Sequence, residues 1–407
     1  MRFIIKNSST GCERVGMLTE FLKMTSAVIE TPTATLLTQG GSVVHLTAEV
    51  LSKVCPNPHL LWVPLSNSVH LEHGLKAQGE GIAKFAGLQN YFTCVTLQNM
   101  NETTPSGHFE NDRVPLWTKH GKKMLTADRY MDLMEVFKPD IILAIADGRT
   151  SLAEGSKRIL KSIERTGNML DLCVKRYKES KELQSSCLVV ILGGVAISGL
   201  TDGSEEFSMD HLQPLGEIFK RVGDAIPKEL LHVVEGCWNP AVILTAVECG
   251  WDLFDGSYAV KLTNLGQALT LNFDVTNDID NPYLLDLIDE CYKDQFVPIL
   301  DGCECLACKK HTRAYIRHLL NTREMLASVL LSIHNLYHFD QMFYHARQHI
   351  VSNTFNVYKA HIIKQYESYK NVQKSESTDS DNQTPQIKKS RVNKEVSDTY
   401  TNSNYST

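Results

Sequence analysis

The sequence predicts an α/β protein built as a (β/α)₈ TIM barrel, with a further subdomain toward its carboxyl-terminal end. Two observations predict the barrel. Apolar runs of strand length alternate with helical patterns between residues 140 and 255, and glycine or an acidic residue closely follows each run. Strands that are apolar throughout and alternate with helices pair in parallel beneath a layer of helices. The chain of 407 residues is long enough to bury such a core.

The amino-terminal part is predicted as short strands that precede the regular units. Pro32 biases the residue before it toward extended backbone, so residues 28–32 are expected to be extended. Gly40 and Gly41 indicate a loop. The expected elements are strands over 2–6 and 16–18, a loop over 36–41, a helical stretch after residues 43–46, and a buried strand over 60–65.

Residues 66–122 carry the weakest pattern in the chain. Breaker residues such as Pro105 and Gly107 predict loops over 79–81 and 98–111. A helical pattern resumes over residues 126–137. No strand is predicted in this stretch.

The regular units follow. Four of them leave room for about as many in the rest of the chain, which fits a barrel better than an open doubly wound sheet. No Gly-rich phosphate fingerprint follows the first strand, and this counts against a dinucleotide fold. The expected strands cover 140–145, 187–192, 231–235 and 251–255, and the expected helices cover 151–180, 212–222 and 240–249.

The functional face of such a barrel lies at the carboxyl ends of its strands. In this chain those ends carry polar residues and glycines. Asp147 with Gly148 is interpreted as a turn, and Gly194 as part of a tight strand exit. The residues at these ends are Asp147, Gly193-Gly194, Glu235-Gly236 and Asp255.

Composition narrows the class of protein. The formal net charge of −6 excludes binding of nucleic acid by the chain as a whole, so any RNA contact must come from a local basic patch or from a partner. No apolar run reaches the roughly 20 residues that span a membrane. The residues from Met1 to Lys6 do not begin an export signal. We therefore expect the eleven cysteines to be reduced and the protein to be cytoplasmic.

Three cysteines and one histidine predict a metal site in the further subdomain. Cys303, Cys305 and Cys308 form a tight knuckle, and His334 follows 26 positions after the last of them. Thiolate sulfur and imidazole nitrogen are the ligands that Zn²⁺ favours, and a closed set of four marks a structural ion. One Zn²⁺ per chain is expected, with one helix running from the knuckle to His334. Other histidines compete for the fourth position: His311, His318, His338 and His345.

The end of the chain has a different composition. Residues 370–407 are rich in Ser, Thr, Asn, Asp, Lys and Gln and hold almost no large apolar side chains. Such a segment cannot bury enough surface to order itself. The sequence therefore predicts a barrel over residues 1–365, which includes the zinc subdomain at about 300–350, and a disordered polar tail over 370–407.

Four motifs, in order along the chain, resemble the tRNA-guanine transglycosylases. The Cys-x-Cys-x₂-Cys knuckle is followed by a histidine within Ile333-His334-Asn335-Leu336. Residues 28–32 are similar to the family's VETP segment, residues 162–166 to its SxxRS/T motif, and residues 250–255 to its GxDxFD strand. The resemblance spans about residues 1–365. It implies a (β/α)₈ barrel with a zinc subdomain, and exchange of an anticodon guanine for a 7-deazaguanine base, which is queuine in eukaryotes.

The resemblance also identifies where this chain departs from the family pattern. Asp255 stands at the position of the family's nucleophile. The second aspartate belongs to a DSGGFQ segment, and residues 84–90, which were matched to it, hold no carboxylate. Residues 256–261 replace the family's LPTR, and residues 193–199 retain only part of its GGLxxGE loop.

These departures imply the accessory group of the queuine tRNA-ribosyltransferase family, which has no catalytic residues of its own. The resemblance then implies a heterodimer with a catalytic subunit, contact with tRNA through that complex, and a zinc subdomain that shapes the partner surface. Peripheral association with the mitochondrial outer membrane is implied by resemblance alone. Two alternatives stay open: a self-sufficient transglycosylase that uses Asp255, and a zinc-stabilised barrel scaffold unrelated to tRNA. The helix face from Leu336 to Ile350 is expected to be core, dimer interface or both.

Overall fold

The computed structural model describes residues 1–8, 11–103, 105, 108, 110–148, 155–189, 194–198, 200, 209–277 and 282–381. The chain divides into two compact units, Met1–Tyr366 and Glu367–Thr407. The last helix, α12 (Phe355–Asp381), begins in the first unit and ends in the second. Residues 370–381 of the predicted tail are therefore helical, whereas residues 382–407 lie outside the described part of the chain.

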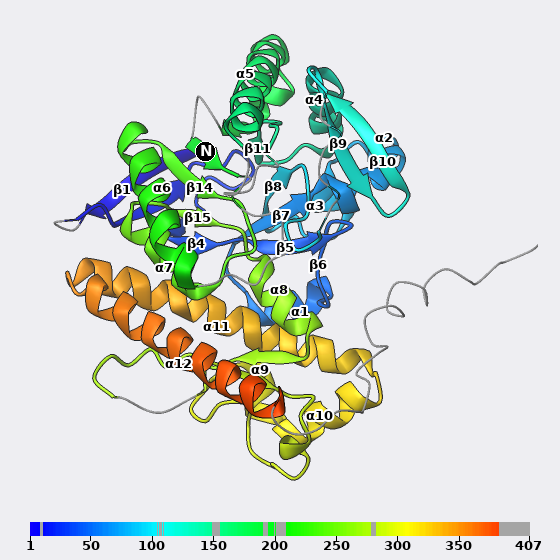
Figure 1. Ribbon diagram of the computed structural model, residues 1–407. Helices are drawn as coiled ribbons and strands as arrows, with labels where there is room; N and C mark the ends of the chain where they lie inside the picture. Colours follow the sequence, from blue (N-terminus) through cyan, green and yellow to red (C-terminus); the bar gives the residue numbers. More distant parts are fainter. Residues whose placement is uncertain are drawn as a thin grey trace, which may run out of the picture. The chain divides into compact units, whose positions relative to one another are not determined.

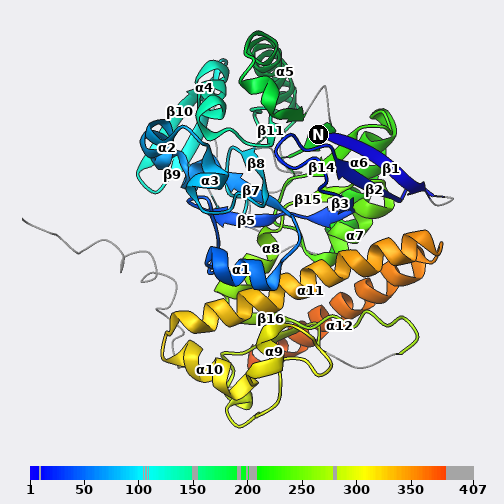
Figure 2. The ribbon, with the colours of Figure 1, turned by 180° about the vertical axis from the view of Figure 1, so that it is seen from behind.

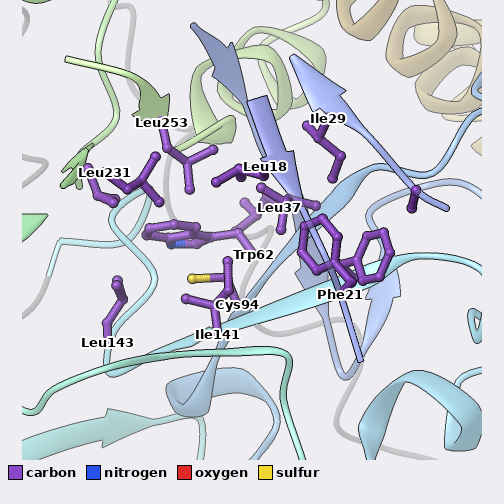
Figure 3. Close-up of a cluster of buried hydrophobic side chains, with 14 of the residues drawn as sticks. Leu18, Phe21, Ile29, Leu37, Trp62, Cys94, Ile141, Leu143, Leu231 and Leu253 are labelled. Carbon is purple, nitrogen blue, oxygen red and sulfur yellow. The ribbon is translucent and has the colours of Figure 1, made fainter. Parts of the chain in front are cut away.

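An antiparallel sheet forms the amino-terminal part of the first unit. Strands β1 (Arg2–Ser8), β2 (Arg14–Thr19) and β3 (Ile29–Thr31) lie in the order β1-β2-β3. The predicted strands at residues 2–6 and 16–18 are confirmed. Leu18, Phe21 and Ile29 bring this sheet onto the central core, where they join Trp62 and Cys94 (Figure 3).

Two sheets of mostly parallel strands form the centre of the unit. The first has the order β12-β11-β8-β7-β5-β6, in which all pairs except β5 with β6 are parallel, and the second has the parallel order β13-β14-β15-β4. Their bounds are β4 Thr33–Ala34, β5 Leu36–Gln39, β6 Ser42–Val43, β7 Leu60–Pro64, β8 Phe92–Thr96, β11 Ile141–Leu143, β12 Cys187–Val189, β13 Gly194–Ile197, β14 Leu231–Val234 and β15 Leu253–Phe254.

The α/β class with parallel strands is confirmed, and the described residues form these two sheets without a closed ring. The loop predicted over 36–41 is wrong in part. Leu36 and Leu37 belong to β5, and their burial between neighbouring elements outweighs the nearby glycines as a local signal.

Helices follow most strands of these sheets (Figure 1). The predicted helices over 126–137, 212–222 and 240–249 are confirmed as α4, α6 and α7. Thr126 caps α4, and Asn239 caps α7 directly before Pro240. The bounds are α1 Ala48–Val54, α2 Glu72–Gln78, α3 Ile82–Phe85, α4 Ala127–Phe137, α5 Ser156–Glu179, α6 Leu212–Ala225, α7 Pro240–Glu248 and α8 Ser257–Asn264.

The stretch without a sequence pattern contains a strand and a hairpin that were not predicted. Strand β8 is buried along its whole length. Strands β9 (Arg113–Thr118) and β10 (Gly121–Thr126) form an antiparallel hairpin, and β10 contacts α4 (Figure 1). Lys119 and His120 form the turn of this hairpin.

Helix α11 of the carboxyl-terminal part lies against the sheets (Figure 2). The single helix predicted between Cys308 and His334 is wrong. Arg323 has a positive φ of 58° in the turn that ends α10 and begins α11, so the chain reverses there. The bounds are β16 Gln267–Leu269, β17 Leu284–Asp286, α9 Leu306–Lys310, α10 Arg313–Asn321 and α11 Met325–Val351.

Helix α11 contacts α8, β16, β4 and β2, and thereby joins the carboxyl-terminal helices to both parts of the sheet structure. The helix face that was expected to be core or interface is buried within the unit. Its members are Leu336, Phe339, Phe343, Ala346 and Ile350. None of the helices among the described residues combines the length and apolar character that crossing a membrane requires.

Candidate metal centre and strand-end cavity

The three cysteines and His334 meet in one cluster, as the sequence predicted. The Nδ1 atom of His334 lies 3.8 Å from the sulfur of Cys303, 3.5 Å from that of Cys305 and 3.3 Å from that of Cys308. All four ligand atoms lie within 4.8 Å of one another. Cys303 is half-buried and the other three are buried. Such a set of one nitrogen and three sulfurs can hold one metal ion.

Short-range backbone geometry aligns the sulfurs. Cys305 is the N-cap of α9, and its sulfur accepts a hydrogen bond of 3.3 Å from the backbone N–H of Cys308. Hydrogen bonds from the thiols of Cys303 and Cys308 lower the pKa of the Cys305 thiol. The cluster therefore favours a thiolate, which is the form of cysteine that binds metals.

A second set of contacts fixes the histidine. His334 Nε2 lies 2.8 Å from the carbonyl oxygen of Leu269 in β16. A proton on Nε2 leaves Nδ1 as the free acceptor that faces the sulfurs. The next residue, Asn335, accepts a hydrogen bond of 2.9 Å from Leu269 N and donates one of 2.9 Å to Gln267 O. These bonds hold the middle of α11 against β16.

The other histidines do not complete the cluster. His338 is buried one turn further along α11, with its ring 4.6 Å from that of His334. His345 stacks on Phe273 and His311 on Tyr315. The structure therefore brings His334, and not its competitors, to the three cysteines among the described residues.

A cavity of about 130 Å³ lies at the carboxyl ends of the central strands. Its walls come from the ends of β8, β11, β13 and β14 and from parts of β9, α4 and α5, and most of the lining residues are apolar. Glu235 is the acidic residue among the described residues that line it. The other polar side chains that the lining offers are those of Gln98, Tyr130, Thr166 and Ser198.

Asp255 does not line this cavity, although it directly follows β15. Its side chain is 1% exposed, and its Oδ1 accepts a hydrogen bond of 2.9 Å from the backbone N–H of Ser257. Burial raises the pKa of Asp255 to about 7, although hydrogen bonds from Ser257 and Gly236 oppose the shift. Burial and the neighbouring Asp255 raise the pKa of Glu235 to about 8. Neither carboxyl group is a fully ionised nucleophile near neutral pH.

Asp147 is held by two arginines of α5 and is more than a turn residue. Its carboxylate accepts a bond of 2.8 Å from Arg158 Nη1 and one of 3.2 Å from Arg165 Nη1, and the side chain is fully buried. Its backbone N–H donates to Thr166 Oγ1 over 3.1 Å. Arg165 and Thr166 belong to the predicted motif at 162–166. The motif therefore fixes the loop after β11.

The segment compared with the family's second aspartate lies away from the strand-end cavity. Residues 84–90 lie at the end of α3 and in the turn that precedes β8, at the amino end of that strand. The segment at the carboxyl end is 97–101, which lines the cavity and also contains no carboxylate. The apolar run of β8 was the signal that could have located it. Of the other predicted segments, residues 194–197 form β13, residue 198 follows it, and residues 193 and 199 lie outside the described part.

The chain is similar to proteins of one family over nearly its whole length. The family model described as "Queuine tRNA-ribosyltransferase" matches residues 10–368. A protein of Culex quinquefasciatus named "Queuine tRNA-ribosyltransferase accessory subunit 2" is 34% identical over 391 residues, which cover 89% of this chain and 91% of that protein. A protein of the same name from Aedes aegypti is 32% identical, over 90% of this chain and 93% of that protein. Another, from Anopheles gambiae, is 31% identical, over 90% of this chain and 90% of that protein.

Proposed function

Because this chain belongs to the queuine tRNA-ribosyltransferase family, we propose that it is the non-catalytic accessory subunit of that enzyme. In this role it supports the exchange of guanine for queuine at the wobble position of the anticodon, and a catalytic subunit performs the chemistry. The observation that carries the proposal is the state of Asp255, which is buried, has a raised pKa and lies outside the strand-end cavity.

The chemistry of base exchange explains why this observation matters. An ionised carboxylate must attack the anomeric carbon of the ribose, and a second group must carry the proton of the departing base. Asp255 cannot reach a ribose without leaving its buried position. The segment that follows β8 supplies Gln98 and Asn99 where the second carboxylate would be needed. Both requirements therefore fall on the partner subunit.

The metal of the cluster is proposed to be a structural Zn²⁺. Cys303, Cys305, Cys308 and His334 would hold it, and a bound zinc ion would fix the subdomain by linking α9 to α11. The donor set fits zinc, since three sulfurs and one imidazole nitrogen are its preferred ligands. With four protein ligands no position is left for a reacting water.

The catalytic subunit is proposed to bind beside this subdomain. Large apolar side chains are exposed there, and Phe296 and Met325 are 75% and 79% exposed. Backbone hydrogen bonds from Arg313 N to Val297 O and from Ala314 N to Gln295 O hold the segment with Phe296 against the start of α10. Exposed apolar groups on a fixed frame are typical of a protein interface. The exposed members are Phe296, Val297, Leu306, Tyr315, Met325 and Leu326.

The two central sheets are proposed to be arcs of one barrel. Only Thr35 separates β4 of one sheet from β5 of the other, and four residues separate β13 from β12. This continuity at both edges supports the barrel of the family. The cytoplasmic location stays a prediction from the sequence, and the contact with the mitochondrial outer membrane stays an implication of the resemblance alone.

Guanine exchange into substrate tRNA tests the proposed function. The assay uses this protein alone, a catalytic subunit alone, and the two together. The proposal expects exchange only in the mixture. Exchange by this chain alone would overturn it in favour of a self-sufficient enzyme, and no effect of this chain on the catalytic subunit would favour a scaffold without a role in tRNA modification.

A further inference from the structure

A basic hollow of about 240 Å³ lies on the strand-end face, apart from the central cavity. Its walls are the loops that follow β5, β7 and β8, together with the turn of the β9–β10 hairpin. It is smaller than the pockets of about 300–1,000 Å³ that hold drug-sized ligands. The polar lining residues that matter here are Asn67, His70, Glu102, Lys119, His120 and Lys123.

Positive charge is concentrated in this hollow, although the chain as a whole has a net charge of −6. Lys119 and Lys123 are exposed at its rim. His70, Lys119, His120 and Lys123 line the same hollow, and partial burial together with the positive charges of the other three lowers the pKa of His70. Glu102 is the only acidic residue among the described lining residues, and its Oε1 accepts a hydrogen bond of 2.8 Å from Asn99.

Hydrogen bonds fix the hollow beside the central cavity. Gln98, which lines the cavity, donates from Nε2 to Trp117 O and accepts from Trp117 N, each over 3.2 Å. Asn99 N donates to Ser66 Oγ over 3.1 Å. The Lys122 ammonium lies 6.0 Å from the centre of the Trp117 ring. The hairpin is thereby held at the cavity wall with its basic turn toward the hollow.

We propose that this hollow binds a backbone phosphate of RNA, and that the β9–β10 hairpin is this chain's own contact with tRNA. Lys119 and Lys123 supply the positive charge, and clustered lysines neutralise backbone phosphates without reading sequence. An RNA fits the surface better than a membrane does, because surface-bound membrane segments bury apolar side chains. None of the exposed large apolar side chains of the described residues lies on this hairpin. The inference rests on the proposed function for the identity of the RNA.

The test measures binding of labelled substrate tRNA to the full-length chain between about 50 and 200 mM salt. The variant is Lys119→Gln with Lys123→Gln, and the control is Lys178→Gln with Lys181→Gln, which removes two exposed charges outside the hollow. We expect the first variant to bind more weakly, with the slope of log K against log salt reduced by about 0.7 for each backbone phosphate that is no longer neutralised. The control should match the wild type. An unchanged affinity and slope in the first variant would overturn the proposal.

Two further measurements distinguish RNA binding by the hollow from membrane binding, and test the hollow independently of the accessory function. If the hairpin variant loses binding to phosphatidylserine vesicles but keeps its affinity for tRNA, the hollow serves a membrane surface and the RNA assignment is wrong. Guanine exchange with the catalytic subunit is measured in parallel. If the variant binds tRNA normally and guanine exchange occurs in the mixture with the catalytic subunit, the hollow is not an RNA site, whereas the accessory function is supported. Weakened tRNA binding by the variant, without exchange in any wild-type mixture, would reject the accessory function and leave the hollow as an RNA site.

Discussion

Replacing Asp255 by asparagine tests both the chemistry and the energetics of the strand-end face. The wild-type carboxyl group has a pKa of about 7 in the folded protein, against an ordinary value of 3.8. Below pH 3.8 the folded and unfolded chains both hold the proton, so the group has no effect on stability. As the pH rises, the unfolded chain releases its proton first, and stability is lost until the folded group also ionises near pH 7.

The size of this effect follows from the shift. A pKa unit corresponds to about 1.4 kcal/mol, so the rise of the Asp255 pKa costs roughly 4 kcal/mol above pH 7, and about 3 kcal/mol of that appears between pH 5 and pH 8. The asparagine side chain has no proton to release, and its oxygen can still accept from the backbone N–H of Ser257. The Asp255→Asn variant is therefore expected to lose about 3 kcal/mol less of its free energy of unfolding than the wild type between these two pH values.

Urea unfolding at pH 5, 6, 7 and 8 measures this difference, with the fluorescence of the buried Trp62 and Trp251 as the probe. The exposed Asp171 supplies the control, since Asp171→Asn should follow the wild-type pH dependence. Exchange by the complex with the catalytic subunit should be the same with Asp255→Asn as with the wild type. If the free energy of unfolding depends on pH in the same way for the variant and the wild type, Asp255 is already ionised in the folded protein. A tenfold loss of guanine exchange in the variant would show that Asp255 acts in the reaction.

Three other perturbations test the remaining parts of the structure. The guanidinium of Arg14 binds the carboxylate of Asp252, which is 0% exposed, over 2.9 Å and 2.5 Å. Arg14→Met leaves this carboxylate without a partner, so the free energy of unfolding in urea at pH 7 should fall by about 3–5 kcal/mol. A fall below about 1 kcal/mol would contradict a stabilising buried ion pair. Metal analysis should find about one Zn²⁺ per wild-type chain and none in the Cys305→Ser variant. Cys291 is an exposed cysteine outside the cluster, so the Cys291→Ser variant should keep both the ion and the wild-type thermal midpoint. Phe296→Asp should weaken binding of the catalytic subunit by about thirtyfold, as expected for an aromatic residue central to an interface. Sedimentation or titration measures the affinity, and the thermal midpoint of the variant should not fall. Leu22→Asp, at a residue that is 68% exposed in the amino-terminal part, should leave the affinity unchanged.

The sequence was most informative where a short spacing determines the geometry. Cys303 lies two residues before the α9 cap, Cys305 is that cap and Cys308 lies in the first turn, so their short spacing predicted that their sulfurs meet. The starts of α4 and α7 are likewise local, because Thr126 and Asn239 cap them through bonds that reach only a few residues. The position of His334 beside the knuckle depends on the reversal at Arg323, which brings α11 back past the knuckle, and no local sequence pattern predicted that reversal.

Features that depend on distant pairing were the ones that the sequence did not predict. Strand β8 is buried by β7 on one side and β11 on the other, and its polar threonines hide the pattern of a core strand. The comparison with the family's second aspartate therefore used residues at the amino end of β8, whereas the cavity lies at its carboxyl end. The basic hollow likewise joins residues that lie far apart in the chain, from Gln39 to Lys123, and no window of the sequence contains them together.

Several ion pairs of the strand-end face hold its loops without any ligand. Asp147 is held by Arg158, Arg165 and Thr166 of the same chain, so these residues stabilise the loop after β11 whether or not a base is bound. Arg14 and Asp252 likewise join β2 to the start of β15 without any ligand. A catalytic carboxylate has the opposite requirement, since it must be ionised and must face an open cavity. Asp255 meets neither condition, whereas the basic hairpin and the apolar groups near the metal cluster meet the conditions for holding an RNA and a partner. These features agree with the proposed role, in which this chain holds the tRNA and another subunit performs the exchange.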